Sequence, residues 1–489
     1  MPVPKNVLIN FLGAAWAGAS IILSTPVFVR QLGFEGFGLI GFWQVLIYLS
    51  MVADLGLGAA FARELARCDG RQDGGESRRA LLRLFERPVL VIAGIMAIAL
   101  FLASGFMAQT WLSFSSIRSD DVERALHWLA LSVAGQFLFG FYANALGGMQ
   151  RMGSMNALQA MNNGLRFLGG AGVATYTRDI TTFFAFQAVT GIGSAALTRA
   201  VLSRAMGPSD GRHVDVGPLR QFVLFSGGMF FTAMCGVLMS HADRLAVSKL
   251  LDAESLGRYS VALTATGLLQ MLVFAFHRAF YPRFAQLNAS GDLVALKKTY
   301  VNACVLLGSV LVPSGLVFLA FTPQLFTIWL GRSDPSTEIV SRVLVFASML
   351  SGLIWLPAAY QQAAGRTRLH AGLMAATLLV GLPMLLWSIQ RWGLAGATSL
   401  MLLHGVIQIT VAQWLMNRDA LRGEISSWYW GVLLRPALVS SGITAVSLLW
   451  LPAGLSRLLL ALWIGSTYLA AVALLIAWIR RAPSTAGRS

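Results

Sequence analysis

The sequence predicts an all-α, polytopic membrane protein with about fourteen transmembrane helices, and three features indicate this fold. Of the 489 residues, 56% are hydrophobic and 12% are charged, whereas soluble globular proteins carry roughly 25% charged residues. The apolar residues fall in blocks of about twenty, long enough for a helix to cross a hydrocarbon core, as in Val301–Phe321 and Arg457–Ile479. These blocks do not alternate with the period of two expected of barrel strands, so their backbone groups must be satisfied within helices.

The expected spans follow one another with short connections. They are approximately residues 7–29, 37–62, 88–108, 125–149, 155–176, 182–203, 221–243, 258–281, 301–322, 338–362, 369–390, 394–416, 431–451 and 457–479. The longest connection on the expected extracytoplasmic side is about Gln109–Arg124. No connection is long enough for a soluble domain, which weighs against membrane glycan polymerases and ligases with large external catalytic loops.

The basic excess follows the topology. The formal charge is +16, a value that can indicate nucleic-acid binding. Roughly twenty-three Lys and Arg residues fall in loops on one side and about ten on the other, the bias that places the richer side in the cytoplasm. Aromatic residues are not interleaved with the basic runs as a single-strand-binding groove requires. We therefore expect both termini to be cytoplasmic and no nucleic-acid partner.

An internal repeat indicates two related halves. The segment Leu32–Gly38 (LGFEGFG) aligns without gaps with Leu251–Gly257 (LDAESLG), at an offset of 219 residues. The offset covers six expected spans, and an even number returns the chain to the same side of the membrane. Parallel repeats of this kind hold substrate between the halves of a transporter. We expect two six-helix bundles, at residues 1–208 and 209–420, and two additional helices with a short tail at 421–489.

One apparent nucleotide motif belongs to this repeat. Residues Gly36–Gly41 (GFGLIG) fit the spacing G-x-G-x-x-G. The dinucleotide fingerprint requires a preceding strand, whereas here the glycines open a membrane span. Glycine in such helices allows close backbone approach, which is the interpretation that we adopt.

The chain also resembles a known family over nearly its whole length. The residues that carry the resemblance are, in chain order, QLGFEGFGLIGFWQVLIYLSMVADLGLGAAFARELAR from Gln31, GGMQRMGSMNALQ after the fourth span, HADRLAVSKLLDAESLGRYSVALTATGLLQ from His241, FYPRFAQL at Phe280–Leu287, and QQAAGRTRLHAGL after the tenth span. They look like the polysaccharide flippases of the O-antigen and exopolysaccharide branch of the multidrug/oligosaccharidyl-lipid/polysaccharide exporter superfamily.

This resemblance implies a fold and a function. The fold is a V-shaped pair of six-helix bundles around a central cavity. The substrate is an undecaprenyl-diphosphate-linked oligosaccharide, moved by alternating access from the inner to the outer leaflet of a bacterial inner membrane. The chain is then a transporter and not an enzyme. Its partners are the lipid-linked oligosaccharide, membrane lipids, and the polysaccharide polymerase and chain-length machinery.

Cations in or near the spans are the candidate residues for the diphosphate and glycan path. Arginine donates two hydrogen bonds to phosphate and stays charged. A charge at the bilayer centre costs roughly 2.5–3.5 kcal/mol on insertion scales, so such residues usually face a cavity or a partner. The candidates are Arg30, Arg166, Arg278, Lys249 and Arg244. Arg30 and Lys249 could instead be interface anchors whose charged ends reach water.

Two acids and one proline complete the candidate set. Asp54, expected deep in the second span, and Asp243, beside Arg244, could bind a proton or Na⁺ or neutralise an arginine. Arg30 is the expected partner of Asp54. Pro26 removes a backbone hydrogen bond from the first span and could make it a hinge or a static kink. We expect no catalytic residues, no metal and no cofactor beyond such a coupling ion.

Three alternatives stay open. A multidrug or metabolite antiporter of the same fold would have a cavity rich in carboxylates and aromatic residues, because its substrates are cations. The excess of intramembrane arginine disfavours it. A membrane glycosyltransferase would need acidic or metal-binding residues in an external loop, and the first such loop offers only Glu35. A lipid II flippase for peptidoglycan is a close relative that the sequence does not separate from the main hypothesis.

Overall fold

The protein is an all-α integral membrane protein, as predicted. The computed structural model describes residues 5–54, 56–68, 74–206, 219–365, 367–415 and 425–481, and within these ranges it contains helices and no strand. Ten helical segments in these ranges are long and apolar enough to cross a membrane. Two of them, Ala15–Ala53 and Gly372–Leu415, have 39 and 44 residues and each cover two expected spans. The total of fourteen stays a prediction.

The chain divides into two compact units, Met1–Ser260 and Val261–Ser489. The bundle boundaries expected at residues 208 and 420 lie outside the described residues. They stay predictions, and each unit is described by itself below.

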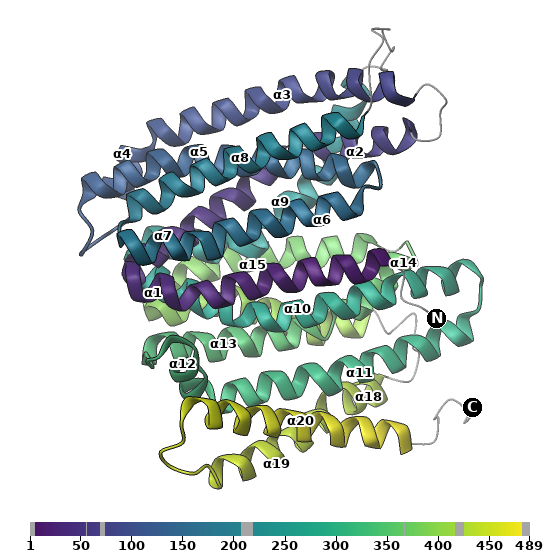
Figure 1. Cartoon of the computed structure of the whole chain (residues 1–489). Helices are drawn as coiled ribbons and strands as arrows, with labels where there is room; N and C mark the ends of the chain where they lie inside the picture. Colours follow the sequence, from purple (N-terminus) through teal and green to yellow (C-terminus); the bar gives the residue numbers. More distant parts are fainter. Residues whose placement is uncertain are drawn as a thin grey trace. The chain divides into compact units, whose positions relative to one another are not determined.

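The first unit is a bundle of long helices in which α5 and α8 run side by side (Figure 1). Its elements are α1 (Lys5–Ala53), α2 (Leu57–Cys68), α3 (Gly74–Leu102), α4 (Ser104–Phe106), the π-helix η1 (Met107–Trp111), α5 (Ser119–Gly148), α6 (Met152–Gly164), the π-helix η2 (Leu165–Gly169), α7 (Gly170–Thr177), α8 (Ile180–Ala205), α9 (Leu219–Leu250) and the first turns of α10 (Ala253–Ala289).

Helix α1 consists of two helical stretches that meet at Gly33. This residue has φ +72° and ψ 179°, a backbone conformation that favours glycine. Pro26 lies inside the first stretch, where the Thr25 Oγ1 hydroxyl donates to the carbonyl oxygen of Ile21 at 2.7 Å. The interruption of α1 is therefore at Gly33, seven residues beyond Pro26. A hinge at Pro26 stays a prediction.

Glu35 attaches this interruption to the segment that precedes α5. Its side chain is 6% exposed and accepts hydrogen bonds from the backbone N–H groups of Ser115 (2.8 Å), Ser116 (3.0 Å) and Ile117 (3.2 Å). The Ser115 hydroxyl donates a further bond. Hydrogen bonds to an ionised group are the stronger class, so Glu35 organises this end of the unit, which we call the Gly33 end.

An ion pair between the buried Glu86 and the half-exposed Arg199 joins three helices of the same bundle. Glu86 of α3 accepts two bonds from the Arg199 guanidinium of α8, at 2.5 and 3.1 Å, and one from the Tyr142 hydroxyl of α5, at 2.7 Å. Such a pair repays its desolvation only when geometry is good and the remaining lone pairs are used. Both carboxylate oxygens are used here. The surrounding core includes the stacked rings of Phe61 and Phe85.

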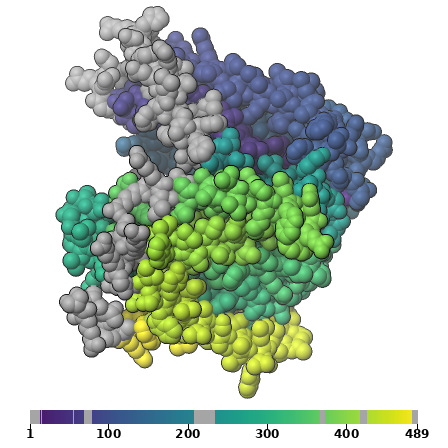
Figure 2. Space-filling model, turned by 180° about the vertical axis from the view of Figure 1, so that it is seen from behind, coloured from purple at the N-terminus to yellow at the C-terminus, as the bar shows by residue number. Residues whose placement is uncertain are grey.

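The second unit begins within α10, at Val261, and its helices pack around an apolar core. Its segments drawn from green to yellow form a continuous packed surface in Figure 2. Its further elements are α11 (Leu293–Ala320), α12 (Thr322–Leu330), α13 (Pro335–Gly352), α14 (Trp355–Ala363), α15 (Thr367–Trp392), the 3₁₀-helix η3 (Gly393–Thr398), α16 (Ser399–Ile407), the π-helix η4 (Gln408–Ala412), α18 (Ile425–Trp428), the π-helix η5 (Tyr429–Leu434), α19 (Arg435–Leu449) and α20 (Arg457–Arg481).

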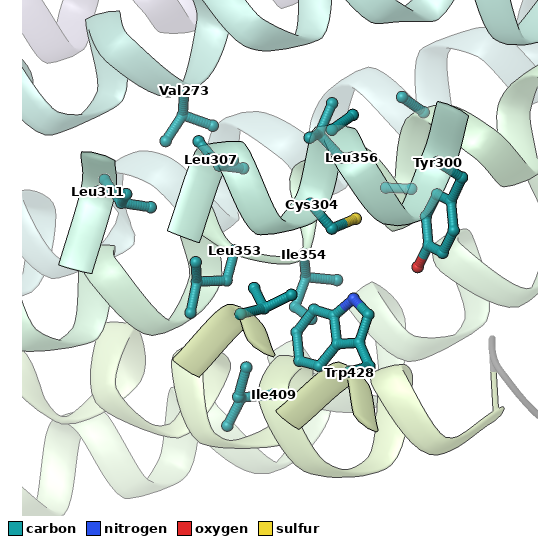
Figure 3. Packing of buried hydrophobic residues seen from close by; sticks show 14 of the residues in the cluster. Val273, Tyr300, Cys304, Leu307, Leu311, Leu353, Ile354, Leu356, Ile409 and Trp428 are labelled. Carbon is teal, nitrogen blue, oxygen red and sulfur yellow. The ribbon is translucent and has the colours of Figure 1, made fainter. Parts of the chain in front are cut away.

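The core of this unit is centred on α11. Leu307 and Leu311 of α11 pack with Leu353, Ile409 and Trp428, all of them nearly or fully buried (Figure 3). Helices α19 and α20 contact each other and α11, so the two helices expected outside the repeat are part of the packed unit.

The Glu35 attachment can be tested by exchange of its amides. Replacing Glu35 by Gln removes the charge that strengthens three backbone hydrogen bonds, and bonds to charged groups contribute about 1.5–3 kcal/mol each to stability. We expect at least tenfold faster hydrogen–deuterium exchange at Ser115, Ser116 and Ile117. Asp120→Asn is the matched control, because the Asp120 side chain is 80% exposed. Unchanged exchange in the Glu35 variant would contradict the attachment.

Candidate functional site

Arg166 lies at the centre of the candidate site in the first unit. It belongs to η2, a π-helical segment, and such segments are often found at functional sites. Its guanidinium carbon lies 4.6 Å from the centre of the Trp43 ring and 5.3 Å from that of Phe167. The side chain is partly exposed, and no carboxylate of the described ranges forms an ion pair with it. Arg166 is therefore a cation held by aromatic faces.

Neighbouring residues fix both partners of this contact. The Gln187 side-chain amide of α8 donates to the carbonyl oxygen of Arg166 at 2.7 Å, which holds the π-helical turn. The Trp43 ring, fully buried, meets the rings of Phe183 and Phe184 edge to face, with centroid distances of 6.4 and 5.8 Å. Aromatic pairs prefer this geometry. The platform beneath Arg166 is thus set by packing before any ligand arrives.

Tyr48 and His241 extend the site toward a second arginine. Tyr48, five residues after Trp43 on α1, stacks on His241 of α9 with centroids 4.3 Å apart and an interplanar angle of 20°. The Tyr48 hydroxyl is within electrostatic range of Arg166, and His241 is within range of Arg244. Arg244 is partly exposed and makes no ion pair with a described carboxylate. We call Trp43, Tyr48, Arg166, His241 and Arg244 the arginine–aromatic cluster.

Asp243 is a buried residue that fixes the backbone next to the cluster. Its carboxylate is 1% exposed and accepts hydrogen bonds from the Tyr259 hydroxyl, at 2.6 Å, and from the backbone N–H of Arg244, at 2.8 Å. Tyr259 lies on α10, so the pair joins α9 to α10. Sequence reasoning expected Asp243 to neutralise an arginine or to bind an ion. The contacts show a buried acceptor that fixes the backbone at Arg244. Charge pairing with an arginine or binding of an ion by Asp243 stays a prediction.

The remaining predicted cations take no part in these contacts. Lys249 donates to the carbonyl oxygen of Thr110 at 2.9 Å and lies 5.3 Å from the Trp111 ring, as expected of an interface anchor. Arg30 is exposed beside the interruption of α1, and Arg278 is exposed in the second unit. A contact of these two with substrate stays a prediction.

Asp54 occupies a different place from the one expected. Helix α1 ends at Ala53, and both Asp54 carboxylate oxygens accept the backbone N–H of Gly58 at 3.0 and 2.9 Å, near the start of α2. Twenty helical residues separate Gly33 from this point, a length of about 30 Å. The expected pair between Asp54 and Arg30 therefore does not form, because Arg30 lies beside Gly33 and Asp54 lies at the far end of the second stretch of α1.

The site can bind an anion next to flat apolar surfaces. Its two arginines supply planar hydrogen-bond donors suited to phosphate or carboxylate, and the half-exposed ring of Tyr48 supplies an apolar face. Sequence reasoning found the arginines and missed both rings, whose only signal was their position in the span that carries the repeat segment. No group of three His, Cys, Asp or Glu side chains placed to hold a metal occurs among the described residues.

Known proteins share this architecture and sequence. A relative from Shigella flexneri, described as "Putative O-antigen transporter", is 23% identical over 423 residues, covering 86% of this chain and 98% of the relative. The structure "Lipid II flippase MurJ, inward closed conformation" aligns with a TM-score of 0.72 at 12% identity, covering 97% of this chain and 99% of that one. The structure of the MATE multidrug transporter DinF-BH aligns with a TM-score of 0.60 at 16% identity, covering 86% of this chain and 96% of that one. Both structural likenesses show the fold.

Family comparison gives the assignment. The MatE family model matches residues 229–387, a third of the chain. The model described as "Polysaccharide biosynthesis protein" matches residues 3–288, more than half of the chain, including every residue of the arginine–aromatic cluster. The chain therefore belongs to the polysaccharide biosynthesis protein family.

Proposed function

We propose that the protein is a flippase that moves polyprenyl-diphosphate-linked oligosaccharide repeat units across the bacterial inner membrane by alternating access. The observation that carries this proposal is the arginine–aromatic cluster, in which two arginines form no ion pair with a carboxylate of the described residues. The family and the Shigella flexneri relative support the same class of cargo.

The cluster suits the two chemically different parts of such a substrate. A diphosphate loses its hydration on leaving water, and fixed cations can replace part of that stabilisation. An arginine already paired with a carboxylate would have to break the pair first, whereas Arg166 and Arg244 have no such pair in the described ranges. The apolar face of a sugar ring can pack on Tyr48, which is 43% exposed, whereas the buried Trp43 ring positions Arg166. A cationic drug, by contrast, would be repelled by both arginines, which disfavours a multidrug antiporter.

Location, coupling and partners follow from this proposal. The protein would lie in the bacterial inner membrane with both termini in the cytoplasm, the orientation that the distribution of basic residues among the loops predicts. A proton or Na⁺ gradient would drive export, and Asp243 and Asp54 are the carboxylates to test for coupling. The polysaccharide polymerase and the chain-length machinery would receive the exported units.

A lipid II flippase is the second candidate. It is favoured by the likeness to the structure of MurJ, which shows the fold and not the cargo. Lipid II also carries a polyprenyl diphosphate, so the cluster by itself fits both substrates. The family assignment favours the polysaccharide substrate.

The cationic site is tested by single substitutions. We expect Arg166→Ala and Arg244→Ala each to lower surface polysaccharide at least tenfold at unchanged protein level. Arg166→Lys should recover only part of the export, because lysine keeps the charge but loses the planar stack on Trp43. Arg118→Ala is the control, since that side chain is 81% exposed. Full export by both alanine variants would refute the site.

The two candidate substrates are separated in vesicles. Purified protein in proteoliposomes should expose a fluorescent polyprenyl-diphosphate-linked repeat unit to an impermeant quencher. It should move lipid II at least tenfold more slowly, and Arg166→Ala should abolish the faster reaction. Faster transport of lipid II would replace the main proposal by the second candidate.

A further inference from the structure

The second stretch of α1 crosses the first turns of α10 with the two backbones in direct contact. Both segments belong to the unit Met1–Ser260. The Cα of Gly38 faces the carbonyl oxygen of Ala253, and the Cα of Gly257 faces the carbonyl oxygen of Phe34. A Cβ added to either glycine would lie less than 3.0 Å from that oxygen, closer than real Cβ atoms come. Only glycine fits at both positions.

These contacts are reciprocal under the internal repeat. The offset of 219 residues relates Phe34 to Ala253 and Gly38 to Gly257. Each glycine therefore faces the carbonyl of the residue that lies four positions before its own repeat equivalent. The offset also relates Gly41 to Ser260, and these two face each other directly. A pseudo-two-fold axis passes between them, so the repeat segments meet through the same surface, as in an isologous dimer contact.

Such a contact is close without being interlocked. At the glycines the two surfaces are backbone, held by van der Waals packing and by Cα–H···O contacts, which are individually weak. No side chain at these positions has to change rotamer for the helices to separate. At the glycines the contact can therefore close tightly and still open, while the Arg258 guanidinium, 5.5 Å from the centre of the Phe34 ring, adds one side-chain contact across it.

The two sides of the crossing are each tied to a different neighbour. Glu35 attaches α1 to Ser115–Ile117, and Tyr259 attaches α10 to Asp243 of α9. Helices α9 and α10 are therefore joined into one hairpin at this end. The backbone N–H of Ala253 donates to the carbonyl oxygen of Ser113 at 2.8 Å. The Lys249 ammonium donates to the carbonyl oxygen of Thr110 at 2.9 Å, and the Trp111 indole N–H donates to the Ser248 hydroxyl at 3.0 Å, so three exchangeable hydrogen bonds also join the two sides. Helix α10 then continues unbroken to Ala289, across the boundary between the units.

We propose that the Gly38–Gly257 crossing is a latch that closes the Gly33 end of the first unit and opens once in each transport cycle. Opening moves the α9–α10 hairpin away from the second stretch of α1. It also shifts the Asp243–Arg244 segment relative to Trp43 and Tyr48, so that opening rearranges the arginine–aromatic cluster. This proposal rests on the transport function proposed above.

A reversible cross-link across the axis tests the latch. Gly41→Cys and Ser260→Cys are combined in a variant whose native Cys68, Cys235 and Cys304 are replaced by alanine. The Cβ atoms would be 3.0 Å apart, near the range of about 3.5–4.5 Å for disulfides. We expect oxidation to lower substrate transport in proteoliposomes at least tenfold and dithiothreitol to restore it. The cysteine-free parent should not respond. Full transport by the oxidised, cross-linked protein would overturn the latch.

A labelling experiment separates the latch from the identity of the substrate. The Ser260 side chain is 4% exposed, so a single Ser260→Cys in the cysteine-free parent reacts with a water-soluble maleimide only when the crossing opens. We expect slow labelling that stops when Gly41→Cys is added and the pair is oxidised. No labelling over many cycles of demonstrated transport would overturn the latch. Labelling in a protein that transports neither lipid-linked substrate would support the latch and reject the proposed function.

Matched glycine substitutions test the reciprocity. Gly38→Ala and Gly257→Ala each place a methyl group against a carbonyl oxygen, whereas Gly267→Ala, on the same helix α10, meets nothing within 4 Å. We expect the first two to raise the labelling of Ser260→Cys by similar factors, at least fivefold, and the third to leave it unchanged. Labelling equal to that of the parent in all three would contradict the crossing. Detergent-stable, monodisperse protein is required of each variant.

Discussion

Inside a hydrocarbon layer each polar group must find its partner within the protein, and this constraint organises the first unit. Its buried acids obey it fully: Glu35 takes three backbone donors and a hydroxyl, and Glu86 and Asp243 each take a tyrosine hydroxyl. The arginines of the cluster differ, since Arg166 and Arg244 make no ion pair with a described carboxylate. A passage for anions requires this arrangement, in which the carboxylates already have hydrogen-bond donors and the nearby arginines are not paired with a carboxylate.

The aromatic platform explains how an open cation is tolerated. A guanidinium is less strongly hydrated than an ammonium and stacks on ring faces, so Trp43 stabilises Arg166 without neutralising it. A carboxylate at the same place would stabilise the arginine more and would compete with any phosphate. Trp43 thus stabilises Arg166 moderately in the absence of ligand, and the positive charge of Arg166 stays available to an anionic ligand.

The fold was accessible from the sequence and much of the site was not, for a physical reason. A membrane span is encoded by a continuous run of apolar residues, which can be recognised in the sequence. The repeat can be recognised from the alignment of LGFEGFG with LDAESLG. The partner of Arg166 is Trp43, which is distant in sequence and lies on another helix, so no local pattern reveals it. The position of Asp54 at the end of a helix could not be predicted from the sequence either. The apolar run continues past it, and only Gly56, with φ +80°, indicates that the chain turns there before α2.

In the two repeat segments, only some of the residues that are identical between the copies have the same structural role. Three of their seven positions agree: leucine, glutamate and glycine. The two glutamates do different work, since Glu35 binds backbone donors whereas Glu254 pairs with Arg258 on its own helix. The two glycines do the same work, each giving room to a carbonyl of the other copy. Because the contact is reciprocal, a side chain at either glycine would separate both backbones, so neither position can change independently. The close contact between the two helices therefore requires glycine at both Gly38 and Gly257.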